Sequence, residues 1–141
     1  MNFEVRTRAD KEHPQAVIFT LTGHLDASTV GILEDRLREQ NQSGPWNWVA
    51  DLSGLEYISS AGLGAFIGAL PGLKANQGHL RFHSLPPKLE RIFQFMGLTQ
   101  YFQIYPDEAS ALSQAGALPA LDSVQGIQLM KPVGAKSAGS N

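Results

Sequence analysis

Apolar and polar residues alternate near the start of the chain, which predicts two strands. Apolar residues alternate with charged ones in Asn2–Thr7, and the same two-residue period returns in Gln15–Thr22. Residues 9–14, ADKEHP, are polar and contain a proline, as is typical of a turn. The two segments are therefore expected to form a β-hairpin that ends at Gly23–Ala27.

Helical spacing replaces this alternation in the next segment. Apolar residues recur every three or four positions in Val30–Leu37, and the residues between them are largely charged. This pattern predicts an amphipathic surface helix, with Asp26 or Ser28 as its N-cap. The helix is expected to stop at residues 41–45, NQSGP.

The rest of the chain is organised around one central stretch, VADLSGLEYISSAGLGAF, at residues 49–66. The short apolar run Trp48–Leu52 is typical of a buried strand. We expect residues 53–54, Ser-Gly, to break this strand, and Tyr57 and Ile58 to bring the chain back to the core.

A second helix is predicted directly after Ser59 and Ser60, because apolar residues follow at helical spacing up to Leu70. Residues 71–72, Pro-Gly, are expected to interrupt it near its end. A helix N-terminus has unpaired N–H groups and a partial positive charge, so a serine there is either a cap or a site for phosphate chemistry.

The glycines of this helix lower its helix propensity, and their expected use is close approach to a neighbouring surface. For Gly68 we expect approach to the sheet. For Gly62 and Leu63, near the start of the helix, contact with the sheet and contact with a partner are equally consistent with the sequence.

The later part of the chain continues the alternation of strands and helices. The predicted order is β-β-α-β-α-β-α-β-α, an α/β class with a mixed, mostly parallel sheet of four to five strands and about four helices. The remaining predicted elements are a strand at His79–Ser84, a helix from residues 86–87 to Gly97, a short strand at residues 102–105 and a short helix capped by Asp107.

Composition limits the class of protein. The 141 residues suit one domain with a sizeable core, and 43% are hydrophobic, so the chain is not of the disordered class. A net charge of −2 gives no electrostatic basis for binding nucleic acid. There is no cysteine, no signal-peptide pattern and no apolar run long enough for a membrane span, so we expect a cytoplasmic protein.

Three strings in this order resemble the STAS domain family, which includes the anti-sigma-factor antagonists. They are LTGHLD at residues 21–26, DLSGLEYISSAGLGAF at residues 51–66, and FQFMGL at residues 93–98. The resemblance implies a single STAS-like domain at residues 1–116. Residues 117–141 then form a C-terminal extension, whose last nine residues read as a disordered tail.

The resemblance also implies roles for residues. In the family, the serine two residues before Gly-Leu-Gly is phosphorylated by a partner kinase, and here that serine is Ser60. The family often has Asp just before it, where this chain has Ser59, which is the second candidate for modification. Asp26 matches a family aspartate beside the phosphorylated serine, so it either shapes the local charge for kinase docking or only caps the first helix. The expected partner-binding residues are His24, Asp26, Ser59, Ser60, Ala61, Gly62 and Leu63.

The implied function is that of a partner-switching regulator without enzyme activity or cofactor. Unmodified, it would bind an anti-sigma factor that is also a serine kinase, and phosphorylated it would release it. A metal-dependent serine phosphatase would reset the switch, and we expect the chain to be a monomer. The alternatives are a STAS component controlling secretion, motility or another output, and a STAS subunit of a transport assembly. Transport subunits commonly lack the phosphorylatable serine, so Ser60 argues against the latter.

Enzyme and metal chemistry find weaker support in the sequence. No P-loop string is present, and Ile58 occupies the first glycine position of a nucleophile elbow. A hydrolase triad could be suggested by Ser60, His24 and Asp26. The incomplete nucleophile-elbow motif argues against such a triad.

Histidines and tryptophans give no clearer signal for a ligand. His79 and His83 share one face of a strand without an evident third ligand, so we expect no metal site. Trp46 and Trp48 are expected in the core rather than in a ligand cage.

Overall fold

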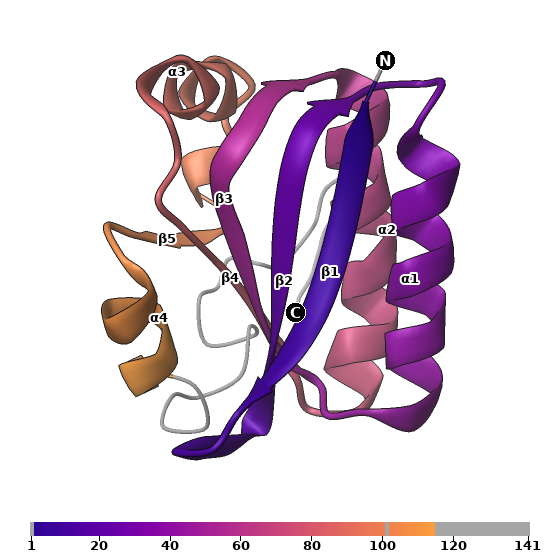
Figure 1. Cartoon of the computed structure of the whole chain (residues 1–141), viewed down its shortest axis with the longest axis vertical. Coiled ribbons are helices and arrows are strands. Elements are labelled where there is room, and N and C mark those ends of the chain that lie inside the picture. Colours follow the sequence, from indigo (N-terminus) through magenta and orange to yellow (C-terminus); the bar gives the residue numbers. More distant parts are fainter. Residues whose placement is uncertain (1, 101, 115–141) are drawn as a thin grey trace.

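Two layers of helices enclose part of a five-stranded sheet in the computed structural model, which describes residues 2–100 and 102–114 (Figure 1). The sheet order is β1-β2-β3-β4-β5, with β1 and β2 antiparallel and every later pair parallel. This confirms the predicted mixed α/β fold. The predicted C-terminal extension lies outside the described residues. The elements are β1 (Phe3–Asp10), β2 (His13–Leu25), α1 (Val30–Ser43), β3 (Asn47–Ile58), α2 (Ser60–Ala75), β4 (His79–His83), α3 (Pro87–Phe95), a 3-10 turn (Leu98–Gln100), β5 (Gln103–Tyr105) and α4 (Glu108–Gln114).

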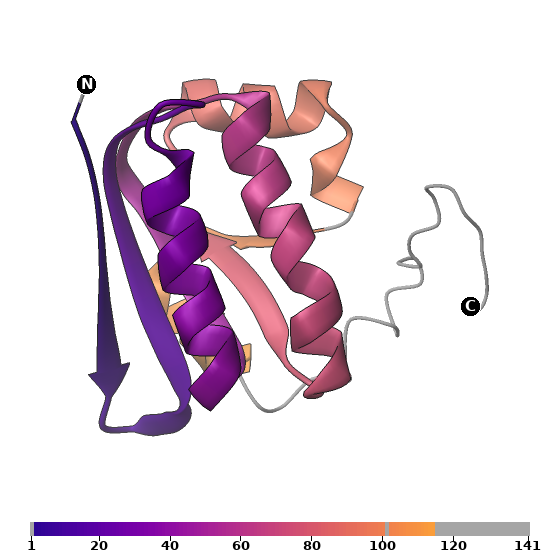
Figure 2. The same cartoon turned by 90° about the vertical axis from the view of Figure 1, so that its right-hand side faces the viewer.

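One face of the sheet is covered by α1 and α2, which lie side by side (Figure 2). The main core forms beneath them around large side chains from the central strands. Phe82 of β4 makes edge-on ring contacts with Phe66 of α2, Phe93 of α3 and Phe102, at centroid distances of 5.0, 5.5 and 4.9 Å. Edge-on aromatic pairs add to the free energy of burial. Through Phe82, this cluster therefore ties α2 and α3 to the sheet.

The other face carries a smaller apolar cluster under α4. Ala111 and Leu112 pack there against Ile18 of β2 and Val49 of β3. Because α4 covers this side of the central strands, all five residues of β4 are buried. The predicted strand at residues 79–84 is confirmed as β4, and its alternating Arg81 and His83 lie on a covered face.

Both central strands are longer than predicted. β2 continues through Gly23, whose φ of +96° and close approach to the Asn2 carbonyl oxygen leave no room for a side chain. β3 continues through Ser53 and Gly54 instead of breaking there, and the register with β2 shifts between Thr20 and Thr22. A shift of this kind absorbs an extra residue without ending the ladder, so turn-forming residues did not end the strand.

The helix α2 also continues past its predicted interruption. Pro71 lies inside it and Gly72 faces Asn41 of α1, where a Cβ atom would lie 2.0 Å from Asn41 Nδ2. The packing of α2 against its neighbours offsets the backbone hydrogen bond that Pro71 cannot make. The expectation for Gly68 was wrong, because this glycine is exposed and nothing lies within 4 Å of the position of its Cβ.

Candidate functional site

Two loops meet at one edge of the sheet, which brings the Asp26 turn beside the start of α2, as the resemblance to the family implies. β2 and β3 are parallel neighbours in which Leu25 pairs with Ile58. The Ser59 N–H donates to the Leu25 carbonyl oxygen at 2.9 Å, so the segment that begins at Asp26 lies beside the start of α2. This edge holds the carboxyl ends of the parallel strands, where open α/β sheets generally place their sites.

The two serines at the start of α2 have different structural roles. Ser59 is the N-cap, with an extended backbone (φ −97°, ψ 174°), and its hydroxyl accepts a hydrogen bond from the Gly62 N–H at 3.4 Å. Ser60 is the first residue of the helix and is exposed. Its hydroxyl has no hydrogen-bond partner within the described chain, so it is free to be modified without losing a contact.

Asp26 organises the turn that leads from β2 into α1. Its Oδ1 accepts hydrogen bonds from the Ser28 N–H at 2.9 Å and from the Ser28 hydroxyl at 2.7 Å. These hydrogen bonds, with further ones from Thr29, lower the pKa of the Asp26 carboxyl. The N-cap of α1 is Thr29 rather than Asp26 or Ser28, and Thr29 donates its hydroxyl hydrogen to the His24 carbonyl oxygen at 2.8 Å.

Beside this turn, His24 lies in a patch with Tyr57 and Glu56, two residues that the sequence did not indicate. The rings of His24 and Tyr57 face each other from neighbouring strands, with centroids 6.4 Å apart, and His24 Nδ1 lies 3.8 Å from Glu56 Oε1. Tyr57 is 45% exposed, so the expectation that it returns to the core was wrong. The register shift between Gly23 and His24 changes which side chains face outward, and no pattern in the sequence marked this shift.

Gly62 and Leu63 lie inside the domain and not on its surface. A Cβ atom at Gly62 would lie 2.7 Å from Leu25 Cγ and 3.0 Å from Ile58 Cγ1, so the missing side chain lets α2 approach the strand ends closely. Leu63 is 2% exposed. Of the two roles left open for this pair, packing against the sheet is the one that the structure bears out.

The accessible side of α2 is composed of other residues. Ala61 is half-buried beside the exposed Ser60, and Gly64 is exposed one turn further along. Ile67 follows on the same side with 45% of its surface exposed, which is high for a large apolar side chain. The start of α2 therefore presents a hydroxyl, small residues and one apolar side chain to solvent.

A hydrolase triad does not form at this site. Within the described residues, no hydrogen bond links the His24 ring to Ser60 or to the carboxylate of Asp26, whose Oδ1 is engaged by Ser28 and Thr29. The arrangement does suit a phosphate on Ser60, because the amide groups and partial positive charge at the start of α2 favour an anion.

Comparison with known proteins gives a consistent result. The STAS domain family matches residues 7–111. The anti-sigma-B factor antagonist of Staphylococcus aureus (strain NCTC 8325 / PS 47) is 28% identical over 104 residues, which are 74% of this chain and 94% of that protein.

Solved structures share the fold. An anti-sigma factor antagonist from Mycobacterium paratuberculosis superposes with a TM-score of 0.72 at 22% identity, covering 81% of this chain and 94% of that one. The phosphorylated form of the Bacillus cell fate determinant SpoIIAA superposes with a TM-score of 0.62 at 20% identity, covering 79% and 98%. No helix within the described residues is long and apolar enough to cross a membrane. With its five-stranded mixed sheet, its serine-headed α2 and the family match over residues 7–111, the chain belongs to the STAS domain family.

Proposed function

We propose that this protein is an anti-sigma-factor antagonist, a partner-switching regulator that binds an anti-sigma factor when Ser60 is unmodified and releases it when Ser60 is phosphorylated. The observation that carries the proposal is the contrast between the two serines. Ser59 is occupied as the cap of α2, whereas Ser60 is exposed and its hydroxyl makes no hydrogen bond to any residue that the structure describes. The relatives named as anti-sigma-B factor antagonists support the same function.

A phosphate on Ser60 would change binding more than it changes folding. It would add a charge of about −1.5 to −2, and the start of α2 would offset about 0.3–1 kcal/mol of the local cost. An unpaired charge left in an interface costs about 2–5 kcal/mol. At about 1.4 kcal/mol per tenfold change in affinity, this corresponds to about 30- to 4000-fold weaker binding.

The proposed partner surface is centred on Ser60 and includes the exposed residues around it. Ala61 and Ile67 extend it along α2, and His24, Asp26 and Ser59 extend it across the strand ends. Gly62 and Leu63 support this surface from within and do not contact the partner directly. The carboxylate of Asp26 adds a negative charge on the neighbouring turn, which suits recognition by a basic group of the partner.

The proposed reaction partners complete the switch. The anti-sigma factor acts as the serine kinase, and a metal-dependent serine phosphatase removes the phosphate. In this scheme the chain is a substrate and a binding partner, and has no catalytic activity of its own.

The proposal can be tested by capturing partners from host lysate on wild-type, Ser60→Ala and Ser60→Asp proteins, with phosphosite mass spectrometry on the wild type. Ser113→Asp is the matched control, because Ser113 is exposed on α4 at the opposite face of the sheet. A kinase-like anti-sigma factor should be retained by the alanine variant and by the control, and lost by Ser60→Asp. Phosphate should map to Ser60.

Two other outcomes would redirect the proposal. If all baits hold the same proteins and Ser60 is never modified, the switch is wrong and Ser60 is only part of the helix start. If the captured kinase controls secretion, motility or a phosphatase, the switch holds and its output is not a sigma factor.

A further inference from the structure

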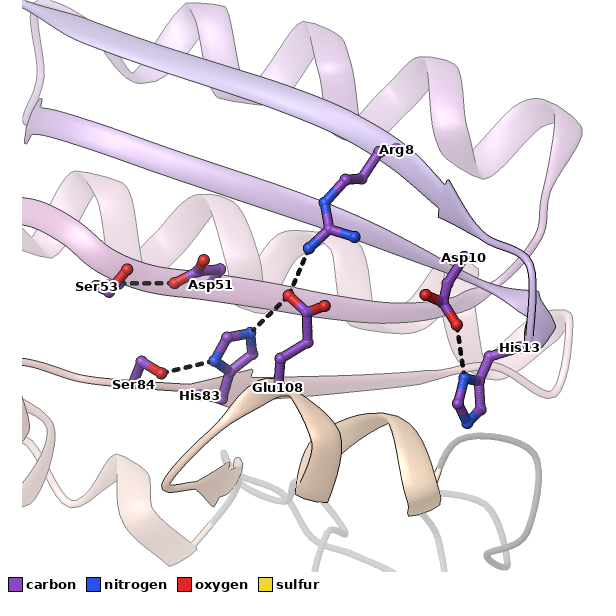
Figure 3. A network of polar contacts seen from close by, with 8 residues as sticks. All are labelled: Arg8, Asp10, His13, Asp51, Ser53, His83, Ser84 and Glu108. Carbon is purple, nitrogen blue, oxygen red and sulfur yellow. Dashed lines mark hydrogen bonds and ion pairs between the residues drawn. The ribbon is translucent and has the colours of Figure 1, made fainter.

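A cluster of potential metal ligands lies on the face of the sheet opposite α1 and α2. Asp51 of β3 and His83 of β4 are direct partners in the parallel ladder, and Glu108 is the first residue of α4, which covers them (Figure 3). We propose that these three side chains bind a divalent metal ion of the first transition series. This inference is independent of the proposed phosphorylation switch.

His83 provides the strongest argument. The residue is 3% exposed, and its Nδ1 lies 2.8 Å from the Ser84 hydroxyl oxygen. Ser84 donates its own hydrogen to the Pro106 carbonyl oxygen at 3.3 Å. The hydroxyl oxygen is therefore left to accept a hydrogen bond from His83 Nδ1–H. That tautomer leaves a lone pair on Nε2 and is the arrangement that typically orients a metal-binding imidazole.

The Nε2 atom of His83 has no ordinary partner. It is buried and makes no hydrogen bond within the described residues, and Glu108 Oε1 lies 3.6 Å from it. A lone pair facing a carboxylate oxygen is unfavourable unless a proton or a metal cation lies between them. A buried nitrogen that makes no hydrogen bond, faces the Glu108 carboxylate and has Asp51 close by is therefore suited to bind a cation.

The spacing also fits a metal ion. The three ligand atoms lie within 4.8 Å of one another. Tetrahedral zinc with bonds of about 2.0–2.1 Å separates its ligand atoms by about 3.3 Å. The distance of 3.6 Å between His83 and Glu108 is already close to this value. The Asp51 carboxylate, which accepts a hydrogen bond from the Ser53 N–H at 2.9 Å, would complete the set by turning toward the other two ligands.

The charge balance favours a cation as well. Arg8 reaches across from β1 and donates to Glu108 Oε1 at 2.6 Å, which holds the carboxylate over His83. Two carboxylates and one guanidinium leave a formal charge of −1 before any ion binds. One imidazole nitrogen and two carboxylate oxygens suit zinc and its neighbours better than calcium or magnesium, which prefer oxygen ligands alone.

The expectation of no metal site rested on His79 and His83 alone. The additional ligands come from β3 and from the start of α4, which are 32 and 25 residues from His83 along the chain. Only the fold brings them together, so no local spacing in the sequence could reveal the site.

The test is equilibrium dialysis of the untagged full-length protein against zinc, with the bound metal counted per chain. We expect one zinc ion per wild-type chain. Asp51→Asn and Glu108→Gln, which preserve shape and remove a ligand charge, should each weaken binding at least tenfold. Ser84→Ala should weaken it about 10- to 100-fold, because it removes the group that orients His83.

The matched control is His13→Gln. His13 lies away from the cluster, and its Nδ1 pairs with Asp10 Oδ2 at a distance of 2.7 Å. This substitution should leave zinc binding unchanged. Nitrogen-15 spectra of the histidine side chains provide a second readout that does not depend on a variant folding. Zinc should shift Nε2 of His83 and leave the ring nitrogens of His13 and His24 in place.

The proposal is overturned if the wild type binds no zinc at an equimolar concentration, or if the three cluster variants bind it as the wild type does. It is also overturned if zinc leaves the His83 ring nitrogens unshifted. A protonated imidazole paired with Glu108 would then account for the geometry.

Discussion

Three of the four glycines in α2, Gly62, Gly64 and Gly68, provide a sharp stability experiment, because only Gly62 among these three is in a confined position. A Cβ atom at Gly62 would lie 2.7 Å from Leu25 Cγ, 2.8 Å from Leu25 Cδ2 and 3.0 Å from Ile58 Cγ1. At Gly64 and Gly68 nothing lies within 4 Å of the Cβ position. Substitution by alanine therefore adds the same methyl group to a packed site and to two open ones.

The magnitudes follow from two opposing effects. Replacing a helical glycine by alanine gains about 0.8–1.0 kcal/mol of helix propensity at each of the three positions. At Gly62 the added methyl also forces Leu25 and the helix apart, and overpacking of this kind costs about 1–3 kcal/mol. We expect Gly62→Ala to lower the free energy of unfolding by about 0–2 kcal/mol. Gly68→Ala should raise it by up to about 1 kcal/mol.

Urea denaturation of the three single variants measures this difference directly. The gain in helix propensity is common to the three variants. The difference in the free energy of unfolding between Gly62→Ala and Gly68→Ala therefore reports the overpacking cost alone, about 1–3 kcal/mol. Gly64→Ala is the nearest control, since it lies two residues from Gly62 in the same helix. If Gly62→Ala were as stabilising as the other two, the close contact between α2 and the end of β2 would be wrong.

Three further predictions concern the helix start, a buried charge and acid stability. Ser59→Ala should lower the free energy of unfolding by about 0.5–1 kcal/mol, because it removes a cap with a long hydrogen bond. Ser60→Ala should change it by less than about 0.5 kcal/mol. Equal losses of stability in urea denaturation would contradict the separate roles of the two serines. Arg81 is fully buried, and this burial lowers the pKa of its guanidinium, while an interaction with Tyr105 only partly opposes the shift. Arg81→Met should therefore raise the free energy of unfolding by about 1–3 kcal/mol, and a loss of stability in the same assay would show that the charge is compensated. The pKa of Asp26 is lower in the folded than in the unfolded chain. Its contribution to stability is therefore present above the ordinary aspartate pKa of 3.8 and is lost as pH falls through the folded value. Asp26→Asn should flatten the fall in stability below that pH, and an unchanged acid profile would argue against the hydrogen bonds from Ser28.

Much of the fold could be predicted because its signals are local. The hairpin, the amphipathic α1, the apolar start of β3 and the helical spacing of α2 each depend on residues near one another in the chain. The meeting of the Asp26 turn with the start of α2 was also predictable, because parallel neighbouring strands deliver their carboxyl ends to one edge.

The failures share a different physical cause. Ser53–Gly54 and Pro71 usually end elements, yet β3 continues because β2 pairs with it at Gly54, and α2 continues because it packs against α1. The alternation of Arg81 and His83 with apolar residues predicted the strand, but not that α4 covers its second face. Tertiary packing overrode local preference in each case, and a single sequence does not contain that information.

The candidate site was likewise predictable only in part from the sequence. The placement of Ser60 at the start of a helix followed from the spacing of apolar residues after it. Which serine is the cap and which is free depends on backbone angles and hydrogen bonds at the turn. The exposure of Tyr57 and the burial of Leu63 depend on a register shift and on the close contact at Gly62.

The most direct test of the central claim is the affinity of the purified anti-sigma partner for two forms of the full-length protein. One form carries phosphate on Ser60, added by the partner kinase, and the other is unmodified; calorimetric titration gives both dissociation constants. The proposed switch predicts binding at least about 30-fold weaker for the phosphorylated form, from the lower end of the cost of an unpaired interface charge. Equal affinities, with phosphate verified on Ser60, would contradict it.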